Sequence, residues 1–315
     1  MNRCPITYQE CGTEKYSEEG LRLLSPRLSE LRDFPFSSEQ QRREAVIRAA
    51  KMSIQGIQPK LSVRLSVRDG IFEIVDRGGR FVLKPQHDRF PQLPENEAVT
   101  MHMAGLAGIE VPVHGLVYCQ DGALSYFIRR FDRLGRGEKV ATEDFAQLSG
   151  MNRETKYESS MERLAELLDR YCTFPALEKQ KLFQRCFFNY LVGNEDMHLK
   201  NFSVITRDGK IELAPAYDFL NTTIAYVAIG KPRGDIEEVA LPLKGRKKRL
   251  TRSLWLDYFG GERLRLNERV VADALQEFKL ALPAWHSLLS VCFLSDDQKR
   301  FYRELLDERC AVLGL

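Results

Sequence analysis

The sequence predicts an α+β fold of two lobes, in which a strand-rich N-terminal lobe precedes a helical C-terminal lobe. Between residues 61 and 128, apolar and polar residues alternate in short runs, and Asp-Gly and Gly-Gly pairs separate these runs, as expected of antiparallel strands joined by tight turns. After residue 133, apolar residues recur every three or four positions, which is typical of amphipathic helices. We therefore expect a helical extension over residues 1–50, the first lobe over 51–131 and the second over 132–315.

The individual elements follow from the same patterns. Capping residues and amphipathic spacing predict short helices within residues 17–50. The predicted strands of the first lobe cover residues 61–67, 71–75, 80–84, 111–118 and 123–128, and a helix at 94–107 lies between the third and the fourth. The second lobe is predicted to contain helices at 161–171, 177–192, 267–282 and 296–313, and a hairpin of strands 202–206 and 210–213.

Length and composition exclude several classes of protein. A chain of 315 residues with 43% hydrophobic residues can bury a large core, and its net charge of +3 is too small to indicate nucleic-acid binding by itself. The seven cysteines are scattered, and Cys4 and Cys11 lack the further ligands of a structural zinc site. No signal peptide and no run of about 18 apolar residues is present, so we expect a cytoplasmic protein that does not enter a membrane.

Residues 194–202, which we call the acidic loop, carry the strongest chemical signal. They read Asn-Glu-Asp-Met-His-Leu-Lys-Asn-Phe, so that Asn201 follows Asp196 by five positions, and Asp218 lies beyond the predicted hairpin. Protein kinases use this spacing for phosphoryl transfer: one Asp accepts the proton of the acceptor hydroxyl, while an Asn and a second Asp hold Mg²⁺. The pattern therefore predicts an ATP-dependent protein kinase whose base is Asp196 and whose Mg²⁺ ligands are Asn201 and Asp218.

Two further residues of the acidic loop are candidates for the same site. His198 either orients the loop or contacts a phosphate, although a single histidine is more often structural. Lys200 is placed to neutralise charge that develops on the transferred phosphoryl group.

A lysine and a glutamate in the first lobe match a second part of a kinase site. Lys84 ends a predicted strand, and Glu97 lies on the helix that follows. Kinases use such a lysine to contact the α- and β-phosphates of ATP and such a glutamate to orient it. Glu95 is an alternative partner for the lysine. Taken alone, both side chains are more simply explained as surface residues.

Two loops complete the predicted ATP site. Residues 55–60, which include Gln58 and Lys60, precede the first strand, where a phosphate-covering loop is expected, but they lack the Walker pattern and are poor in glycine. Arg130 and Phe131 follow the last strand, where the hinge between lobes would present backbone groups to adenine. Each segment is also compatible with an ordinary loop or linker.

Residues 244–249, Lys-Gly-Arg-Lys-Lys-Arg, form the most basic run of the chain. A run of this kind is usually a solvated loop. It could otherwise contact an acidic protein, or the phosphates of DNA within a larger complex.

With these residues assembled, the chain resembles the HipA family of bacterial serine/threonine kinases, the toxins of type II toxin–antitoxin systems. The resemblance implies a kinase-like fold, the roles given above, and ATP and Mg²⁺ as cofactors. It further implies autophosphorylation of a serine in the phosphate loop, which is Ser53 here. The stretches that carry the resemblance are residues 53–60, 81–85, 95–98, 128–133, 194–202 and 214–218.

Only about fifty residues precede the phosphate loop, which resembles the short HipT branch of the family. In that branch the missing N-terminal subdomain is a separate small antitoxin, HipS, which acts beside a DNA-binding HipB. The resemblance thus implies HipS-like and HipB-like partners, contact with DNA only through the complex, and an aminoacyl-tRNA synthetase as substrate, by resemblance the tryptophan enzyme. Phosphorylation of that enzyme would inhibit translation.

Two other functions are compatible with the sequence. The chain could be an inactive pseudokinase subunit of a DNA-binding repressor complex, in which case the basic run would matter more than the acidic loop. It could also be a small-molecule kinase of the aminoglycoside or choline type, since these enzymes share an acid followed by Asn and a later Asp. The loop before the first strand and residues 128–133 favour a protein substrate.

Overall fold

The computed structural model describes residues 1–48, 58–135, 138–151 and 155–315. The chain forms two compact units. Unit 1 comprises Met1–Val99, Pro112–Lys139 and Val291–Leu294, and unit 2 comprises Thr100–Val111, Val140–Ser290 and Ser295–Leu315. The domain boundaries that we expect at residues 50 and 131 stay predictions.

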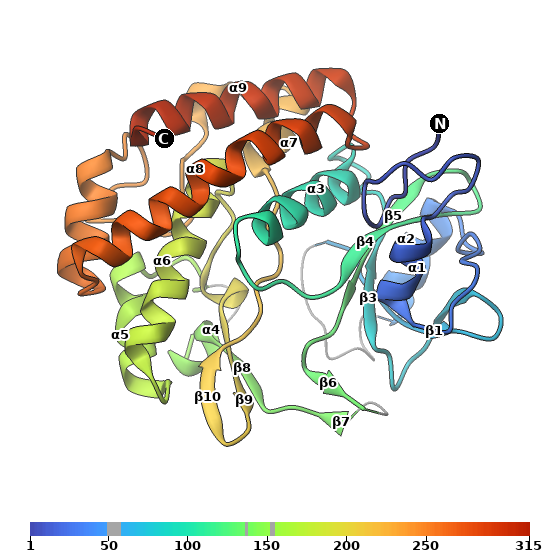
Figure 1. Ribbon diagram of the computed structural model, residues 1–315. Helices are drawn as coiled ribbons and strands as arrows, with labels where there is room; N and C mark the ends of the chain where they lie inside the picture. The colour runs from blue at the N-terminus through green and yellow to red at the C-terminus, as the bar shows by residue number, and fades with distance from the viewer. Residues whose placement is uncertain (49–57, 136–137, 152–154) are drawn as a thin grey trace. The chain divides into compact units, whose positions relative to one another are not determined.

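Unit 1 is built on a five-stranded antiparallel sheet with the order β2-β1-β3-β5-β4 (Figure 1). In the register, Leu61 pairs with Leu83 and Lys84 pairs with Tyr126. Short turns join β1 to β2 and β4 to β5, because Gly70 and Gly122 adopt the left-handed conformation that such turns require. The strands are β1 (Leu61–Ser66), β2 (Ile71–Ile74), β3 (Phe81–Lys84), β4 (His114–Tyr118) and β5 (Leu124–Arg129).

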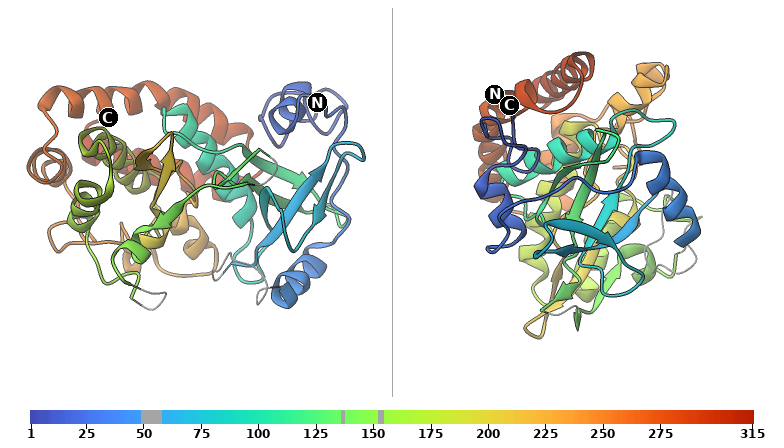
Figure 2. Two further views of the ribbon diagram at one scale, coloured as in Figure 1. Left: turned by 90° about the horizontal axis from the view of Figure 1, so that it is seen from below. Right: turned by 90° about the vertical axis from the view of Figure 1, so that its right-hand side faces the viewer.

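The N-terminal segment folds against this sheet. Helix α1 (Glu18–Leu24) begins at Ser17, whose hydroxyl accepts the Gly20 N–H, and α2 (Ser38–Arg48) packs against β1. Figure 2 shows α2, in blue, beside the strands. The N-terminal segment and the sheet share one core, in which the rings of Phe72, Phe81 and Phe127 contact one another at 5.3–6.1 Å.

Helix α3 (Leu93–Leu106) begins in unit 1 with two buried glutamates. The Gln86 amide donates to both carboxylate oxygens of Glu95, at 2.8 and 2.9 Å, and to the Leu124 carbonyl at 2.9 Å. Burial nevertheless raises the pKa of the Glu95 carboxyl to about 7, because an ionised carboxylate loses more hydration there than one neutral donor restores.

Unit 2 is mainly helical and surrounds α6 (Pro175–Val192). Proline is favoured in the first helical turn, where it leaves no hydrogen bond unmade, and the left-handed Gly193 ends the helix. Phe183 and Phe187 on α6 pack on Phe259 and Trp255. The other α- and π-helices in the described part of this unit are α4 (Phe145–Leu148), α5 (Met161–Tyr171), α7 (Thr222–Ala228), α8 (Glu268–Val291), α9 (Asp296–Leu313) and the π-helix η3 (Leu254–Arg263).

Two small sheets complete the described fold. In unit 2, β8 (Thr142–Asp144), β9 (Ser203–Arg207) and β10 (Lys210–Leu213) pair in the order β10-β9-β8, and the hairpin of β9 and β10 is the one expected from Asp208-Gly209. In unit 1, β6 (Arg133–Leu134) pairs with β7 (Glu138–Lys139). No sequence pattern indicated β6, β7, β8 or α4, because each of these elements is only two to four residues long.

Helix α8 differs from its predicted range. The prediction ended the helix at residue 282, before Pro283, but the helix continues to Val291. The buried side chains of Trp285, Leu288 and Leu289 lie beyond the proline, and the Trp285 indole N–H donates to the Met103 carbonyl at 2.8 Å. Fully burying a side chain of this size is worth about 1.5–3 kcal/mol, so these residues together offset the backbone hydrogen bond that proline removes.

Within the described ranges, no helix is both long and apolar enough to span a membrane.

Gly193 connects α6 to the acidic loop and offers a test of this junction. A Cβ at Gly193, where φ is +74°, would lie 2.5 Å from Leu305 Cδ2 and 2.9 Å from Thr223 Oγ1. We expect Gly193→Ala to lower the free energy of unfolding by about 3 kcal/mol, from backbone strain plus overlap, as measured by urea denaturation.

The matched control is Gly209→Ala, in the β9–β10 turn, which has φ +73° and no atom within 4 Å of the added Cβ. In this variant the free energy of unfolding should fall only by the backbone strain, about 1 kcal/mol. Equal losses for the two variants would show that the α6 junction tolerates a side chain.

The buried Glu95 predicts an unusual pH dependence of stability. Its pKa is near 4.5 when unfolded and about 7 when folded, so the folded state binds the proton more tightly. The resulting stabilisation is complete below pH 4.5 and is lost as the pH rises through 7. Glu95→Gln should therefore be more stable than the wild type at pH 8, by up to about 3 kcal/mol, and similar to it at pH 4. Thermal unfolding across pH 4–8 measures this difference, with the exposed Glu143→Gln as the surface control. A constant difference across that range would contradict a buried protonated carboxyl.

Candidate active site

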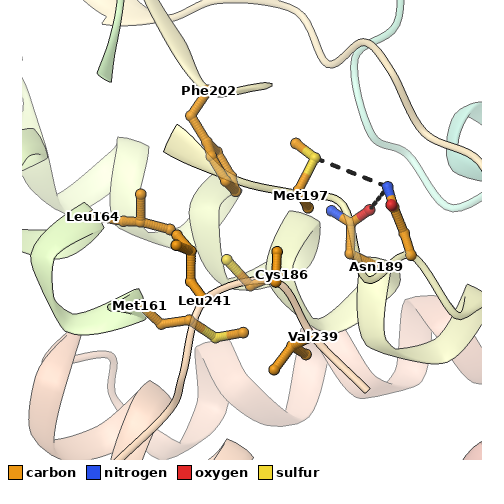
Figure 3. A pocket seen from close by; sticks show the side chains of 10 residues that line it. Met161, Leu164, Cys186, Asn189, Met197, Phe202, Val239 and Leu241 are labelled. Atoms are coloured by element: carbon orange, nitrogen blue, oxygen red, sulfur yellow. Dashed lines mark hydrogen bonds between the residues drawn. The ribbon is translucent and has the colours of Figure 1, made fainter. Parts of the chain in front are cut away.

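The acidic loop begins where α6 ends, and the side chain of Asn194 fixes its start. The Asn194 amide nitrogen donates to Asn189 Oδ1 at 2.8 Å and to the Asp218 carbonyl at 3.3 Å, and its amide oxygen accepts the Asp196 N–H at 3.2 Å. The same nitrogen lies 4.0 Å from the Met197 sulfur, and dashed lines in Figure 3 end at the labelled Asn189 and Met197. One buried amide thus joins α6, the acidic loop and the backbone at Asp218.

Asp196 and Asn201 are held together within the acidic loop. The Asn201 amide nitrogen donates to the Asp196 carbonyl at 3.0 Å, and the Asn201 N–H donates to the His198 carbonyl at 2.9 Å in the short turn η1 (Leu199–Asn201). Asn201 is buried, whereas Asp196 is half-buried. Because its nitrogen is engaged, the amide oxygen of Asn201 is the atom suited to a cation.

Asp218 reaches the same place from a different segment. Its φ of +57° is uncommon for a residue with a side chain. The carboxylates of Asp218 and Asp196 both lie near the His198 ring, and the negative charge of each raises the pKa of the imidazole. Asp196 and Asp218 thus both lie near the His198 ring, and Asn201 is bonded to the backbone of Asp196. The roles of the three side chains stay predictions.

The start of α7 supports the loop from behind. The Thr222 hydroxyl accepts the Glu195 N–H at 2.7 Å and donates to the Gly193 carbonyl at 3.0 Å. The Thr223 hydroxyl donates to that same carbonyl at 3.1 Å. The segment that follows Asp218 therefore holds both ends of the turn that precedes Asp196.

His198 is neutral at neutral pH. The pKa of its imidazole is lowered to about 4, mainly by burial and in addition by the Lys156 ammonium, against the opposite effect of the two aspartates. The Lys156 Nζ lies 2.5 Å from His198 Nε2, so the ring nitrogen accepts from the ammonium. His198 is thus a hydrogen-bonding member of the loop, not a cation that could attract phosphate.

For Lys200, the carbonyl accepts the Tyr217 hydroxyl at 2.9 Å, and the side chain is half-buried. Its role toward a phosphoryl group stays a prediction.

Lys84 and Glu97 form a buried ion pair in unit 1. Lys84 Nζ lies 2.6 Å from Glu97 Oε1, and the two side chains are 4% and 1% exposed. Lys84 Nζ also lies 5.6 Å from the centre of the Tyr126 ring. Of the two glutamates considered from the sequence, Glu97 is therefore the partner of the lysine, while Glu95 binds the Gln86 amide.

The predicted phosphate loop is only partly described. Gln58 and Lys60 lie within the described residues, whereas Ser53 and Gln55 lie outside them. The side-chain nitrogen of Gln58 is buried, and within the described part of the chain no acceptor contacts it. A buried donor of this kind suits an anionic ligand such as a phosphate.

The segment predicted to contact adenine is occupied by internal contacts. The Arg130 guanidinium makes two bonds to the Asp132 carboxylate, at 2.9 and 2.7 Å, and the Arg130 N–H donates to the Arg80 carbonyl at 2.8 Å. That N–H is thus engaged within the protein. Phe131 is half-buried in the turn that follows.

The residues near Asp196 fit a magnesium ion. Mg²⁺ prefers oxygen ligands and usually takes one or two from the protein, with waters and substrate phosphates completing the octahedron. The Asn201 amide oxygen and the Asp218 carboxylate are such a pair. Within residues 1–48, 58–135, 138–151 and 155–315, no group of three or more His, Cys, Asp or Glu residues is arranged for a metal.

Two residues that the sequence analysis did not identify lie directly against the acidic loop. The Tyr157 hydroxyl donates to Asp196 Oδ1, and the Lys156 ammonium contacts His198, as described above. Both lie about forty residues before the loop, between α4 and α5. The sequence carries no signal for them, because their proximity depends on how the chain folds.

A small cavity lies beside the acidic loop, between α5, α6 and the segment at Val239 (Figure 3). Its volume of about 10 Å³ admits at most one water molecule, and its lining is largely apolar, so it is a packing defect and not a ligand site. A larger groove of about 440 Å³ lies between the start of α6 and β10, and no residue of the acidic loop lines it.

Comparison with known proteins identifies relatives that are named kinases. A putative kinase from Haemophilus influenzae is 32% identical over 242 residues, which are 71% of this chain and 69% of that protein. The serine/threonine-protein kinase toxin HipA of Shewanella oneidensis is 27% identical over 191 residues, covering 54% of this chain and 43% of that protein. The matched segments span between 43% and 69% of the length of these two proteins and of two further putative kinases.

Solved structures show the fold. HipA from the Shewanella oneidensis MR-1 complex with HipB and operator DNA has a TM-score of 0.69 at 21% identity, covering 91% of this chain and 74% of that one. The proinflammatory kinase CtkA of Helicobacter pylori has a TM-score of 0.53 at 18% identity, covering 74% and 86%. These similarities confirm the predicted kinase-like fold class. Residues 52–285 match the HipA-like C-terminal domain, and the chain therefore belongs to the HipA-like kinase family.

Proposed function

We propose that this chain is the toxin kinase of a type II toxin–antitoxin system and transfers the γ-phosphate of ATP to a serine of a protein. The observation that carries the proposal is the acidic loop. Asn201 is bonded to the Asp196 carbonyl, Asn194 joins the loop to the backbone at Asp218, and both carboxylates act on His198. An acid, an amide and a second acid in one place are what phosphoryl transfer requires.

In the proposed reaction, Asp196 accepts the proton of the acceptor serine as the serine oxygen bonds to the γ-phosphorus. The bond from that phosphorus to the bridging oxygen breaks, and ADP leaves with the electron pair. Mg²⁺ held by Asn201 and Asp218 would neutralise charge on the phosphates. Lys84 would pair with the α- and β-phosphates, and its bond to Glu97 at 2.6 Å keeps it charged and oriented.

The substrate and partners follow from the resemblance to the HipA family. We propose an aminoacyl-tRNA synthetase as target, the tryptophan enzyme if the chain belongs to the short HipT branch, and inhibition of translation as the result. The similarity to HipA in a complex with HipB and operator DNA supports a HipB-like partner. A HipS-like antitoxin would be the second partner, and contact with DNA would be made through the complex.

The basic run does not favour the alternative of a DNA-binding repressor subunit. Lys247 pairs with Glu237 at 3.0 Å, and the Lys248 ammonium donates to the Gly234 carbonyl at 2.7 Å. The Arg249 N–H donates to Glu238 at 3.0 Å. Two cationic side chains and one backbone group of this run therefore serve to fold the loop.

Single substitutions at Asp196 in the acidic loop and at Asp218 test the proposed activity. We expect Asp196→Asn and Asp218→Asn each to reduce transfer of labelled phosphate from ATP to a synthetase by at least about 100-fold and to abolish growth arrest. Asp208→Asn, which changes an exposed aspartate in the β9–β10 turn, is the matched control and should retain full activity.

Phosphate transfer that survives Asp218→Asn would overturn the assignment of Asp218 as a metal ligand. An inactive wild type with ATP and Mg²⁺ would favour a pseudokinase, and labelling of small molecules alone would favour the small-molecule kinase.

Autophosphorylation is a separate expectation. We propose Ser53, which lies outside the described residues, as the modified residue. Intact mass spectrometry after incubation with ATP should show one added phosphate that Ser53→Ala removes. An unmodified protein would exclude regulation at this serine and leave the kinase proposal standing.

A further inference from the structure

Two consecutive residues, Lys156 and Tyr157, contact the acidic loop at three positions. The Tyr157 hydroxyl donates to Asp196 Oδ1, and the Lys156 Nζ lies 2.5 Å from His198 Nε2. The Lys156 carbonyl accepts the Leu199 N–H at 3.4 Å. Side chains and backbone thus bind residues 196, 198 and 199 together from one side.

The ring of Tyr157 adds a packing contact to these bonds. It meets the His198 ring edge-on, with 4.9 Å between centroids and 85° between planes, and the Lys156 ammonium lies 4.8 Å from its centre. Lys156 is buried, whereas 40% of Tyr157 is exposed. The tyrosine therefore lies at the rim of the loop, with its hydroxyl turned onto the carboxylate.

The hydroxyl of Tyr157 is a permanent donor. Burial and the neighbouring Asp196 carboxylate raise the pKa of the phenol, so it stays protonated throughout the physiological range. A phenol at this position always occupies one oxygen of Asp196 and leaves the other for a second donor.

We propose that Lys156 and Tyr157 are positioning residues, a clamp that fixes the carboxylate of Asp196 so that one oxygen is held by Tyr157 and the other faces the acceptor hydroxyl. This inference rests on the proposed function, in which Asp196 accepts the proton of the acceptor. The hydroxyl of Tyr157 acts only through Asp196, and Lys156 acts through His198.

The contacts favour a clamp over a plug that must leave before the substrate binds. To block Asp196 as a plug, Tyr157 would need only the hydrogen bond from its hydroxyl to that carboxylate. Here a buried lysine and a backbone carbonyl bind the same loop at His198 and Leu199, and a movement of Tyr157 would have to break a packed set of contacts. A carboxylate also has lone pairs for several donors, so the phenol and an acceptor hydroxyl can bind together.

The test compares two tyrosines that each donate to a carboxylate. Tyr157→Phe removes the donor to Asp196 and keeps the ring against His198. The matched control, Tyr258→Phe, removes a hydroxyl that donates to Glu162 Oε1 at 3.0 Å, away from the acidic loop. Phosphorylation of the synthetase is measured for both variants and the wild type, with kcat and KM determined separately for ATP.

We expect Tyr157→Phe to lower kcat about tenfold, as for the loss of a hydrogen bond to a charged group, while KM for ATP and the melting temperature stay within error. Tyr258→Phe should leave kcat unchanged. In an Asp196→Ala background, Tyr157→Phe should cause no further loss of the residual rate, because the hydroxyl acts through that carboxylate.

Three outcomes for Tyr157→Phe bear on the clamp. An unchanged kcat for Tyr157→Phe in an active enzyme would overturn the clamp. An increased kcat would show a plug and would also overturn it. If Tyr157→Phe fails to fold, Lys156→Met gives the second test, with a similar loss in kcat expected and an unchanged rate counting against the clamp. A wild type without activity refutes the proposed function itself, which is a different result from any of these.

Discussion

The buried amide of Asn194 is the interaction on which the candidate site depends. It contacts the last turn of α6, the backbone of Asp196 and the backbone of Asp218, at distances between 2.8 and 3.3 Å. Its side chain is almost fully excluded from water, and in a low-dielectric interior such bonds are strong and their loss is costly. One side chain therefore determines where two acids that lie 22 positions apart meet.

The backbone around this amide is left-handed in two places, and both serve the site. Gly193 takes a left-handed conformation to end α6 so that the loop can reverse direction, and glycine does this at little cost. Asp218 takes a similar conformation with a side chain, which costs on the order of 1 kcal/mol. Strain of this kind persists where surrounding contacts fix the backbone, and here the bond from Asn194 to the Asp218 carbonyl is such a contact.

The sequence predicted the parts of the site that depend on local spacing. Asp196 and Asn201 lie on one short loop, so their separation of five residues carried the information directly. The choice between Glu95 and Glu97 could not be made in that way, because residues two apart on a helix point to different sides, and only the fold decides which side holds Lys84. Lys156 and Tyr157 were missed for the same reason, since no spacing links them to residues forty positions later. The predicted end of α8 at residue 282 was wrong, because the helix continues past Pro283 through side chains that are buried beyond it.

The electrostatics of the loop follow from which neighbours are charged. His198 and Lys156 are in contact and buried, and burial together with the neighbouring ammonium lowers the pKa of the imidazole, which stays neutral. The direct donor to Asp196 Oδ1 is then a neutral phenol. A neutral donor orients a carboxylate oxygen without placing a full positive charge against it. An imidazolium donor would place such a charge there. The arrangement thus holds one oxygen of Asp196 by a neutral donor, which suits the proposed role of this carboxylate as a proton acceptor.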